Sequence, residues 1–257
     1  MPNVYAGASA RWHDDYELGR PGWPAEVLEV ARLPAKAAVA ELGAGTGKLT
    51  RLLVKRFADV VAVEPDEGMR RRLGAICVGA RVLPGSAEEI PLEDASVDAV
   101  FAAESFHWFD PVQAPAEIAR VLRPLGALVL AWNLPAGPTQ PSIEAAERVL
   151  RRRAPDETAF GADPLDLDPA RYASGDWRRA FEHGPFEQFR EVRIPHVQTV
   201  DREALVSFFA SMGWIAALPD AERLPLLEEA RARLGADEYD RPWESHVHWT
   251  RLRADPR

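Results

Sequence analysis

The chain of 257 residues is 47% hydrophobic and 28% charged, a composition typical of a globular protein that can bury a core of its own. Its 31 Lys and Arg residues against 40 Asp and Glu residues give a formal net charge of -9, which disfavours a nucleic-acid substrate because phosphate contacts supply most of that affinity. The single cysteine, Cys77, excludes an internal disulfide and is typical of a cytoplasmic protein. We expect no membrane partner, because no stretch reaches the roughly 20 apolar residues of a bilayer span and residues 1–12 lack a signal-peptide pattern.

Strand and helix patterns alternate between Ala37 and Asn133, after an N-terminal segment rich in proline and aromatic residues. The strand segments are short, apolar and mostly unalternating, which is typical of parallel strands with helices on both faces. The expected strands are residues 38–41, 60–64, 81–83, 97–102 and 127–132, and the expected helices are residues 48–57, 66–74 and 111–122. Repeated units of this kind predict right-handed crossovers and a doubly wound sheet.

The rhythm changes after Asn133. A proline-rich loop leads to a predicted helix ending in three arginines, and residues 154–184 follow no clean period, as in many lids and binding loops. We then expect a strand at residues 189–200, a helix capped by Asp201, a helix at residues 220–234 and a final antiparallel strand at residues 246–253. The predicted domains are an N-terminal lid or helix (1–36), a cofactor-binding Rossmann-like core (37–133), an insertion or cap (134–188), and C-terminal strands with inserted helices that complete the sheet and cap (189–257).

The most informative motif follows the first strand. Glu41 ends that strand and is followed by Gly43, Gly45 and Gly47, a turn in which bare backbone can approach a ligand. The second strand ends in Glu64, and an acid at that place commonly holds a nucleoside ribose. In the nicotinamide fingerprint the third glycine stands where Lys48 is found. An acid before the turn also disfavours a pyrophosphate and suits a ligand with an ammonium or sulfonium group.

These motifs, with several later ones in the same order, resemble the class I S-adenosylmethionine-dependent methyltransferases, in the small-molecule branch that includes trans-aconitate methyltransferase-like proteins. The segments that carry the resemblance are residues 41–47, 63–69, 85–91, 97–100, 105–109 and 118–126. It implies an α/β fold, with a Rossmann-like doubly wound, mostly parallel seven-stranded sheet, an antiparallel last strand and a helical cap. It also implies methyl transfer from S-adenosylmethionine to an oxygen, nitrogen or carbon atom of a small-molecule acceptor.

The resemblance implies which residues hold the cofactor. Those expected along its methionine part are Glu41, Gly43, Ala44 and Gly45. Glu64 would accept hydrogen bonds from both ribose hydroxyls, a role that fits the two oxygens of a carboxylate. Pro65 and Met69 would pack on the adenine, although Met69 is also explained as core filler. The residues expected at the adenine edge are Ser86, Ala87 and Glu88, and many relatives carry an aspartate in place of Ser86.

The residues expected around the transferred methyl group follow the fourth strand. Ala103 and Glu104 would touch the cofactor through their main chain. His107 could act as a general base, since its ordinary pKa is near 6.5, or it could simply pack with the aromatic side chains that follow it. Tyr16 and Arg20 would form a lid, with Arg20 towards the cofactor carboxylate, unless this segment only covers the edge of the sheet.

The acceptor is not predicted beyond its class. The residues considered for its pocket are Trp177, Phe181 and Trp214, which core packing explains better, and the weaker candidates Arg171, Tyr172 and Arg193. We expect no metal site, because His246 and His248 lack a nearby third ligand. Two other functions remain open at this stage, a homologue that binds the cofactor without catalysis and a nicotinamide-dependent oxidoreductase. The oligomeric state is not predicted.

Overall fold

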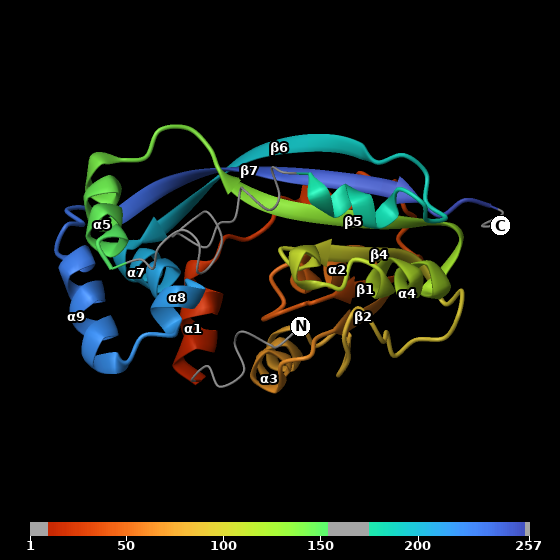
Figure 1. The fold of residues 1–257 in the computed structure, drawn as a ribbon, viewed down its shortest axis with the longest axis horizontal. Coiled ribbons are helices and arrows are strands. Elements are labelled where there is room, and N and C mark those ends of the chain that lie inside the picture. The colour runs from red at the N-terminus through yellow and green to blue at the C-terminus, as the bar shows by residue number, and fades with distance from the viewer. Residues whose placement is uncertain (1–9, 154–174, 255–257) are drawn as a thin grey trace.

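The computed structural model describes residues 10–153 and 175–254 (Figure 1). Its strands form one seven-stranded sheet in the order β3-β2-β1-β4-β5-β7-β6. The strands are β1 (Ala38–Leu42), β2 (Asp59–Val63), β3 (Arg81–Leu83), β4 (Val97–Ala103), β5 (Leu122–Pro135), β6 (Arg190–Asp201) and β7 (Glu238–Arg251). Only β7 runs against its neighbours, being antiparallel to both β5 and β6. This arrangement confirms the predicted doubly wound sheet with an antiparallel last strand.

Helices lie on both faces of this sheet and beyond its end (Figure 1). The α-helices are α1 (Ala10–Gly19), α2 (Thr50–Arg56), α3 (Glu67–Ile76), α4 (Gln113–Val121), α5 (Pro141–Arg151), α7 (Arg202–Ala210), α8 (Gly213–Ala216) and α9 (Asp220–Arg231). The short 3-10 helices are η1 (Ala25–Leu28), η2 (Phe106–Trp108) and η3 (Asp176–Phe181). None of the helices described here combines the length and apolar character that a bilayer span needs.

The order of the strands fixes where a ligand can bind. From β1 the chain moves outward through β2 to β3, then returns to the other side of β1 as β4. The connections on the two sides therefore diverge above the carboxyl ends of β1 and β4. Such a switch point leaves a crevice in open α/β sheets, and ligands bind there. Every residue of β1 is buried, so the crevice is built on a rigid central strand.

Two apolar layers hold the sheet. On one face, η1 and α2 pack Val27 and Leu53 against Val39 and Phe101. On the other face, α4, η2 and η3 contribute Ile118 and other side chains that pack over β4 and β5, including Phe106, Trp177 and Phe181. These layers explain why the central strands read as unbroken apolar runs in the sequence.

The strand β7 begins earlier than residue 246, where the sequence places it. Its first half alternates strictly, with Tyr239, Arg241 and Trp243 buried and their neighbours more exposed. Charged residues and a proline in this half obscure the pattern in the sequence. There β7 pairs with β6, and the two strands extend past the central strands as a ribbon (Figure 1).

A second hydrophobic core forms around this ribbon. Helices α5, α7, α8 and α9 gather at that end of the molecule and pack on Tyr239 and Trp243 (Figure 1). Arg241 is buried among them, with its guanidinium 4.0 Å from the ring centroid of Phe208 and 4.8 Å from that of Trp243. Burial lowers the pKa of Arg241 to about 10. We call this part of the protein the helical lobe.

The start of α7 provides a test of how this lobe is held. The Asp201 carboxylate accepts a hydrogen bond from the amide of Ala204 at 2.7 Å, as the predicted helix cap requires. We expect Asp201→Ala to lower the free energy of unfolding by about 1 kcal/mol. Urea unfolding followed by circular dichroism measures this change. Asp59→Ala, which removes an exposed aspartate from the first position of β2, is the matched control, and equal losses in both variants would contradict the cap.

Candidate active site

The turn after β1 is shaped by glycines in the left-handed region of backbone space. Gly43 has φ = 66° and Gly45 has φ = 57°, conformations that other residues rarely adopt. The amides of Gly43 and Ala44 donate to the Val63 carbonyl at 2.9 and 3.2 Å, which fastens the turn to the end of β2. A Cβ at position 43 would lie 2.6 Å from the Cβ of Ser105, so glycine is required there by the protein itself.

Gly45 differs from Gly43 because it faces no close protein neighbour. A Cβ built at position 45 meets only the Sδ of Met69, at an ordinary contact distance of 3.8 Å. Beside it, the hydroxyl of Thr46 is buried and forms no hydrogen bond with the described residues. A buried hydroxyl without a partner is unfavourable, so it suits a polar group of a ligand. The turn therefore has the features of a cradle for a small polar ligand.

Glu64 stands at the tip of β2 and connects this turn to the next loop. Its side chain is 5% exposed. One carboxylate oxygen accepts from the amide of Gly45 at 2.8 Å and the other from the amide of Asp66 at 2.9 Å. Burial raises the pKa of Glu64, and the two amide donors oppose that effect. Each oxygen retains capacity for a further hydrogen bond, as a ligand with two adjacent hydroxyls would need.

Glu41 lies deeper in the same crevice and is 2% exposed. Its carboxylate accepts a hydrogen bond of 2.5 Å from the hydroxyl of Thr50 in the first turn of α2. Burial raises the pKa of Glu41 to about 8, and the nearby Glu64 carboxylate adds to the shift. The two acids predicted to meet the ligand therefore lie close together, with different hydrogen-bond partners.

Helix α1 closes one side of the crevice. Nε2 of His13 lies 3.0 Å from a carboxylate oxygen of Asp66, directly after Glu64 and Pro65. The His13 ring also lies so close to Gly68 that a Cβ there would be 2.2 Å from the ring carbon Cε1. The predicted lid thus contacts the loop that follows Glu64, the acid predicted to bind the ribose.

The two lid residues predicted from the sequence face the helical lobe. Nε of Arg20 donates to the hydroxyl of Ser211 at 2.9 Å, and its guanidinium lies 5.4 Å from the ring centroid of Tyr16 and 5.6 Å from that of Phe208. The same helix therefore binds both the crevice loop and the lobe. The structure brings Tyr16 and Arg20 together, and it shows Arg20 directed to Ser211, whereas the sequence predicts a contact with the cofactor carboxylate.

The predicted adenine residues are only partly gathered at the crevice. Met69 is buried in α3 beside the glycine turn, and Pro65 is exposed at the mouth. Ser86 is half-buried. The side chain of Ala87 packs into the apolar layer over β4 and β5, so only its backbone can face a ligand. A carboxylate oxygen of Glu88 accepts from the amide of Asp110 at 2.8 Å, which ties this loop to the start of α4.

The end of β4 is held in an uncommon backbone conformation. Ala103 is the last strand residue, and Glu104 follows with φ = 52°, a left-handed value that is costly for a residue with a side chain. The amide of Glu104 donates to the Ala131 carbonyl at 2.9 Å, and its carboxylate accepts from the amide of Asn133 at 2.5 Å. These bonds to β5 fix the strained residue, and strain of this kind is typical of functional sites.

His107 lies in η2, at the mouth of the switch point. Its ring stacks at a tilt on Trp108, with 4.9 Å between the centroids, and Nε1 of Trp132 donates to Nδ1 of His107 at 3.4 Å. With Nδ1 as acceptor, the neutral ring carries its proton on Nε2. A general-base role, as predicted, would require the ring to give up the Trp132 bond. The geometry instead favours His107 as a hydrogen-bond donor through Nε2.

The remaining candidates lie away from the glycine turn or outside the described residues. Trp177 and Phe181 pack with Phe106 in the main core, and Trp214 is buried in the helical lobe. Arg171 and Tyr172 lie outside the described residues. Among the described residues no three His, Cys, Asp or Glu side chains are grouped as a metal site would require.

Strand β7 carries two histidines, of which His248 packs against Trp132 and Trp177. Nε2 of His246 lies 2.6 Å from a carboxylate oxygen of Glu244. His248 is fully buried against Trp177, and burial, followed by the Arg178 charge, lowers the pKa of His248 to about 4. It is therefore neutral at physiological pH.

Several site residues escape sequence reasoning. Thr46 and Thr50 lie within or just after the glycine motif, and a hydroxyl inside such a turn is a usable signal. Asn133 lies near the end of β5, accepts a hydrogen bond from the Ser245 hydroxyl at 2.6 Å and donates one to the Gly22 carbonyl at 3.1 Å. No local sequence pattern predicts a role for Asn133, because its partners come from distant parts of the chain.

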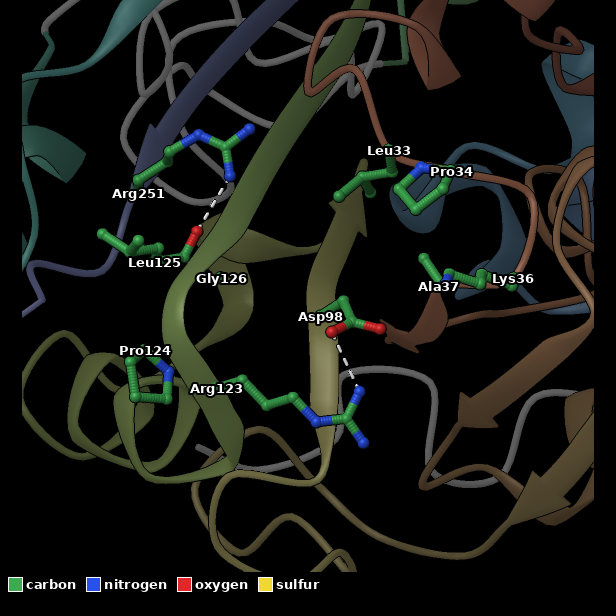
Figure 2. Close-up of a pocket in the computed structure, with 10 residues that line it drawn as sticks. All are labelled: Leu33, Pro34, Lys36, Ala37, Asp98, Arg123, Pro124, Leu125, Gly126 and Arg251. Carbon is green, nitrogen blue, oxygen red and sulfur yellow. Dashed lines mark hydrogen bonds and ion pairs between the residues drawn. The ribbon is translucent and has the colours of Figure 1, made fainter.

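A recess at the opposite edge of the sheet is a different feature (Figure 2). It lies where β1 and β4 begin, and it is lined partly by Asp98, Arg123 and Arg251. Arg123 pairs with Asp98 at 2.9 Å, and Arg251 donates to the carbonyls of Leu125 and Ala31 at 2.8 and 2.9 Å. These cations already have protein partners and hold the first residues of β5 in place, and the recess is separate from the crevice.

The doubly wound sheet, the glycine turn at its switch point and the acid at the tip of β2 define a nucleoside-binding α/β protein. Residues 40–130 match a family model described as a methyltransferase domain. An uncharacterized methyltransferase-like protein of Schizosaccharomyces pombe is 33% identical over 214 residues, which cover 81% of this chain and 78% of that protein. The chain belongs to the methyltransferase family.

Two further comparisons agree with this assignment. An uncharacterized methyltransferase of Mycobacterium tuberculosis is 52% identical over 118 residues, 46% of this chain and 49% of that protein, so the match spans about half the length of this relative. A solved structure of a candidate type II methyltransferase from Anaeromyxobacter dehalogenans has the same fold, with a TM-score of 0.60, 21% identity, and coverage of 92% of this chain and 99% of that one. The family supports the prediction that the cofactor is S-adenosylmethionine.

The contrast between the two glycines yields a prediction. We expect Gly45→Ala to cost only about 1–2 kcal/mol of stability, because its backbone is left-handed but its Cβ meets no close protein atom. The same methyl group would enter the ligand space and weaken binding of S-adenosylmethionine more than about tenfold, or 1.4 kcal/mol. Calorimetric titration and thermal unfolding measure the two effects. Gly43→Ala is the comparison, and it should destabilise the protein more, because of the clash with Ser105. Unchanged affinity in Gly45→Ala would contradict the cradle.

Proposed function

We propose that this protein transfers the methyl group of S-adenosylmethionine to an oxygen, nitrogen or carbon atom of a small-molecule acceptor. The observation that carries the proposal is the Glu64 carboxylate, held by backbone amides at the tip of β2 beside a glycine turn that faces no close protein neighbour. Membership in the methyltransferase family supports the reaction class. The acceptor class rests on the small-molecule branch that the sequence resembles.

The residues present fit the cofactor. The remaining acceptor sites on the Glu64 oxygens suit the two ribose hydroxyls. The amino-acid tail would lie along Gly43, Ala44 and Gly45, where the Thr46 hydroxyl offers an unused donor and Glu41 a nearby acid. The buried side chain of Met69 would form the floor under the adenine.

When bound, S-adenosylmethionine supplies an electrophilic methyl group on a sulfonium centre. The contribution of the protein is then to hold the acceptor in line with that group and to exclude water. We assign the placing of the acceptor to His107, whose ring is oriented by Trp132 and stacked on Trp108. The aromatic surroundings also favour a sulfonium cation.

The setting and partners of the protein form part of the proposal. The formal charge of -9 supports a small-molecule acceptor over a nucleic acid. The single cysteine supports a cytoplasmic setting. We propose no membrane partner.

The cofactor assignment is tested at Glu64. We expect Glu64→Ala to weaken S-adenosylmethionine binding about 10- to 100-fold, since it removes charge-assisted hydrogen bonds worth about 1.5–3 kcal/mol. Isothermal titration calorimetry measures the dissociation constants. Glu187→Gln, which neutralises an exposed glutamate far along the chain, should bind like the unmodified protein. Equal affinity in the Glu64 variant would show that the ribose is held elsewhere, and tighter binding of a nicotinamide cofactor would favour an oxidoreductase.

Catalysis is tested at His107. We expect His107→Phe to bind S-adenosylmethionine within about twofold of the unmodified protein, and to turn over at least about tenfold more slowly, a barrier increase of 1.4 kcal/mol. The assay follows formation of adenosylhomocysteine with a panel of small acids, amines and phenols. A variant with full turnover would remove His107 from the reaction. Cofactor binding without turnover on any acceptor would favour a homologue that has lost its chemistry.

A further inference from the structure

The crevice contains two buried acids without a neutralising cation in contact. Neither Glu41 nor Glu64 forms an ion pair with the residues that the structure describes, although both are more than nine-tenths buried. The cations of this region bind other groups, and Arg70 donates to the main-chain carbonyls of Glu64 and Pro65 rather than to a carboxylate. Arg51 donates to a main-chain carbonyl and to the carboxylate of Glu17 at 2.8 Å, and Nζ of Lys48 donates to the carbonyl of Glu17. The site therefore contains more acid than base.

The hydrogen bonds around the two acids are unequal. Glu64 accepts two backbone amides, one from Gly45 and one from Asp66, and amides donate only to an acceptor. The side chain of Glu41 has a single hydrogen bond with the described residues, to the hydroxyl of Thr50. A hydroxyl can donate to a carboxylate or accept from a carboxylic acid. When two acids share a site, the one with the better donors keeps its charge and the other keeps a proton. That second acid is Glu41.

The groups on the other neighbouring elements do not reverse this result. Cys77 of the α3 end is buried, and burial raises the pKa of its thiol, so it contributes no charge. Asp66 and Arg70 act on Glu64 in opposite directions. Among the described residues, the Arg51 charge favours ionisation of Glu41, but burial and Glu64 outweigh it and raise the pKa of Glu41 to about 8.

We propose that Glu41 carries a proton in the unliganded protein and releases that proton to solvent when the cationic cofactor binds. The inference rests on the proposed function, because it requires a ligand with an ammonium or sulfonium group in the crevice. The O–H bond of Glu41 breaks, the electron pair stays on the carboxylate, and the proton passes to the buffer. The resulting carboxylate balances the net positive charge that the cofactor brings, so binding leaves the net charge of the crevice unchanged.

The raised pKa of Glu41 makes both the stability of the protein and its affinity for the cofactor depend on pH. A carboxyl group whose pKa is raised in the folded protein stabilises the folded state below its unfolded pKa, and this stability is lost as the pH rises through the folded pKa. The unliganded protein should therefore lose stability towards pH 8. Cofactor affinity should rise over the same range, by at most about tenfold per pH unit for one released proton.

Proton release is measured by titration calorimetry at pH 7 in two buffers of different ionisation enthalpy. Glu41→Gln, which imitates the protonated acid in size and charge, is the key variant, and Glu187→Gln is the matched control. We expect the unmodified protein and the control to release close to one proton more than Glu41→Gln on binding S-adenosylmethionine. Comparison with the variant is essential, because the amino group of the cofactor itself titrates in this range. Equal proton counts, with binding intact in all three proteins, would overturn the inference.

A second measurement needs no cofactor. Thermal unfolding of the unliganded proteins between pH 6 and pH 9 should show a melting temperature that falls with pH in the unmodified protein relative to Glu41→Gln. Parallel curves would overturn the inference even if no cofactor bound. Diverging curves without cofactor binding would instead uphold the buried proton and refute the proposed function. An infrared difference spectrum on adding cofactor should show loss of a protonated carboxyl band, and its persistence would also count against proton release.

Discussion

The site depends on one bridging carboxylate. Glu64 joins the amide of Gly45, in the turn after β1, to the amide of Asp66, in the loop after β2, and so fixes the distance between the tips of two adjacent strands. The left-handed turn, the cap of α3 and the contact of His13 all adjoin this bridge. Because the bridge is buried, its hydrogen bonds compete with little water. The crevice is therefore formed before any ligand arrives, which lowers the entropic cost of binding.

Helix α1 joins this crevice to the rest of the molecule. One side of the helix contacts Asp66 through His13, while Arg20, directly after its end, binds Ser211 at the end of α7 in the helical lobe. Asp15 adds a bond to Ser207, with 3.1 Å between the oxygens. Helix α1 and the lobe are thus joined by side-chain hydrogen bonds. The two proposals agree with the burial of Glu41 and Glu64, because a site that excludes water makes a carboxylic acid such as Glu41 favour its proton.

Local patterns in the sequence predict the sheet, the glycine turn and the acids at positions 41 and 64 well. Unbroken apolar runs identify the central strands, and the turn is specified by residues next to one another. Prediction is poorer where distant segments meet. The early start of β7 is hidden, because Arg241 is a charged residue that becomes buried against Phe208, a residue distant in the sequence, and Trp243. Arg20 turns to Ser211, and His107 receives a bond from Trp132, for the same reason: neither partner is near in sequence.

The protein has separate apolar interiors for its two halves. The layers around β1 and β4 support the cofactor end, while the ribbon of β6 and β7 carries Tyr239 and Trp243 into another interior with α5, α7 and α9. Substitutions that reshape one interior leave the packing of the other largely intact. Such modularity lets substitutions accumulate in the lobe while the strands that carry the glycine turn and Glu64 keep their positions.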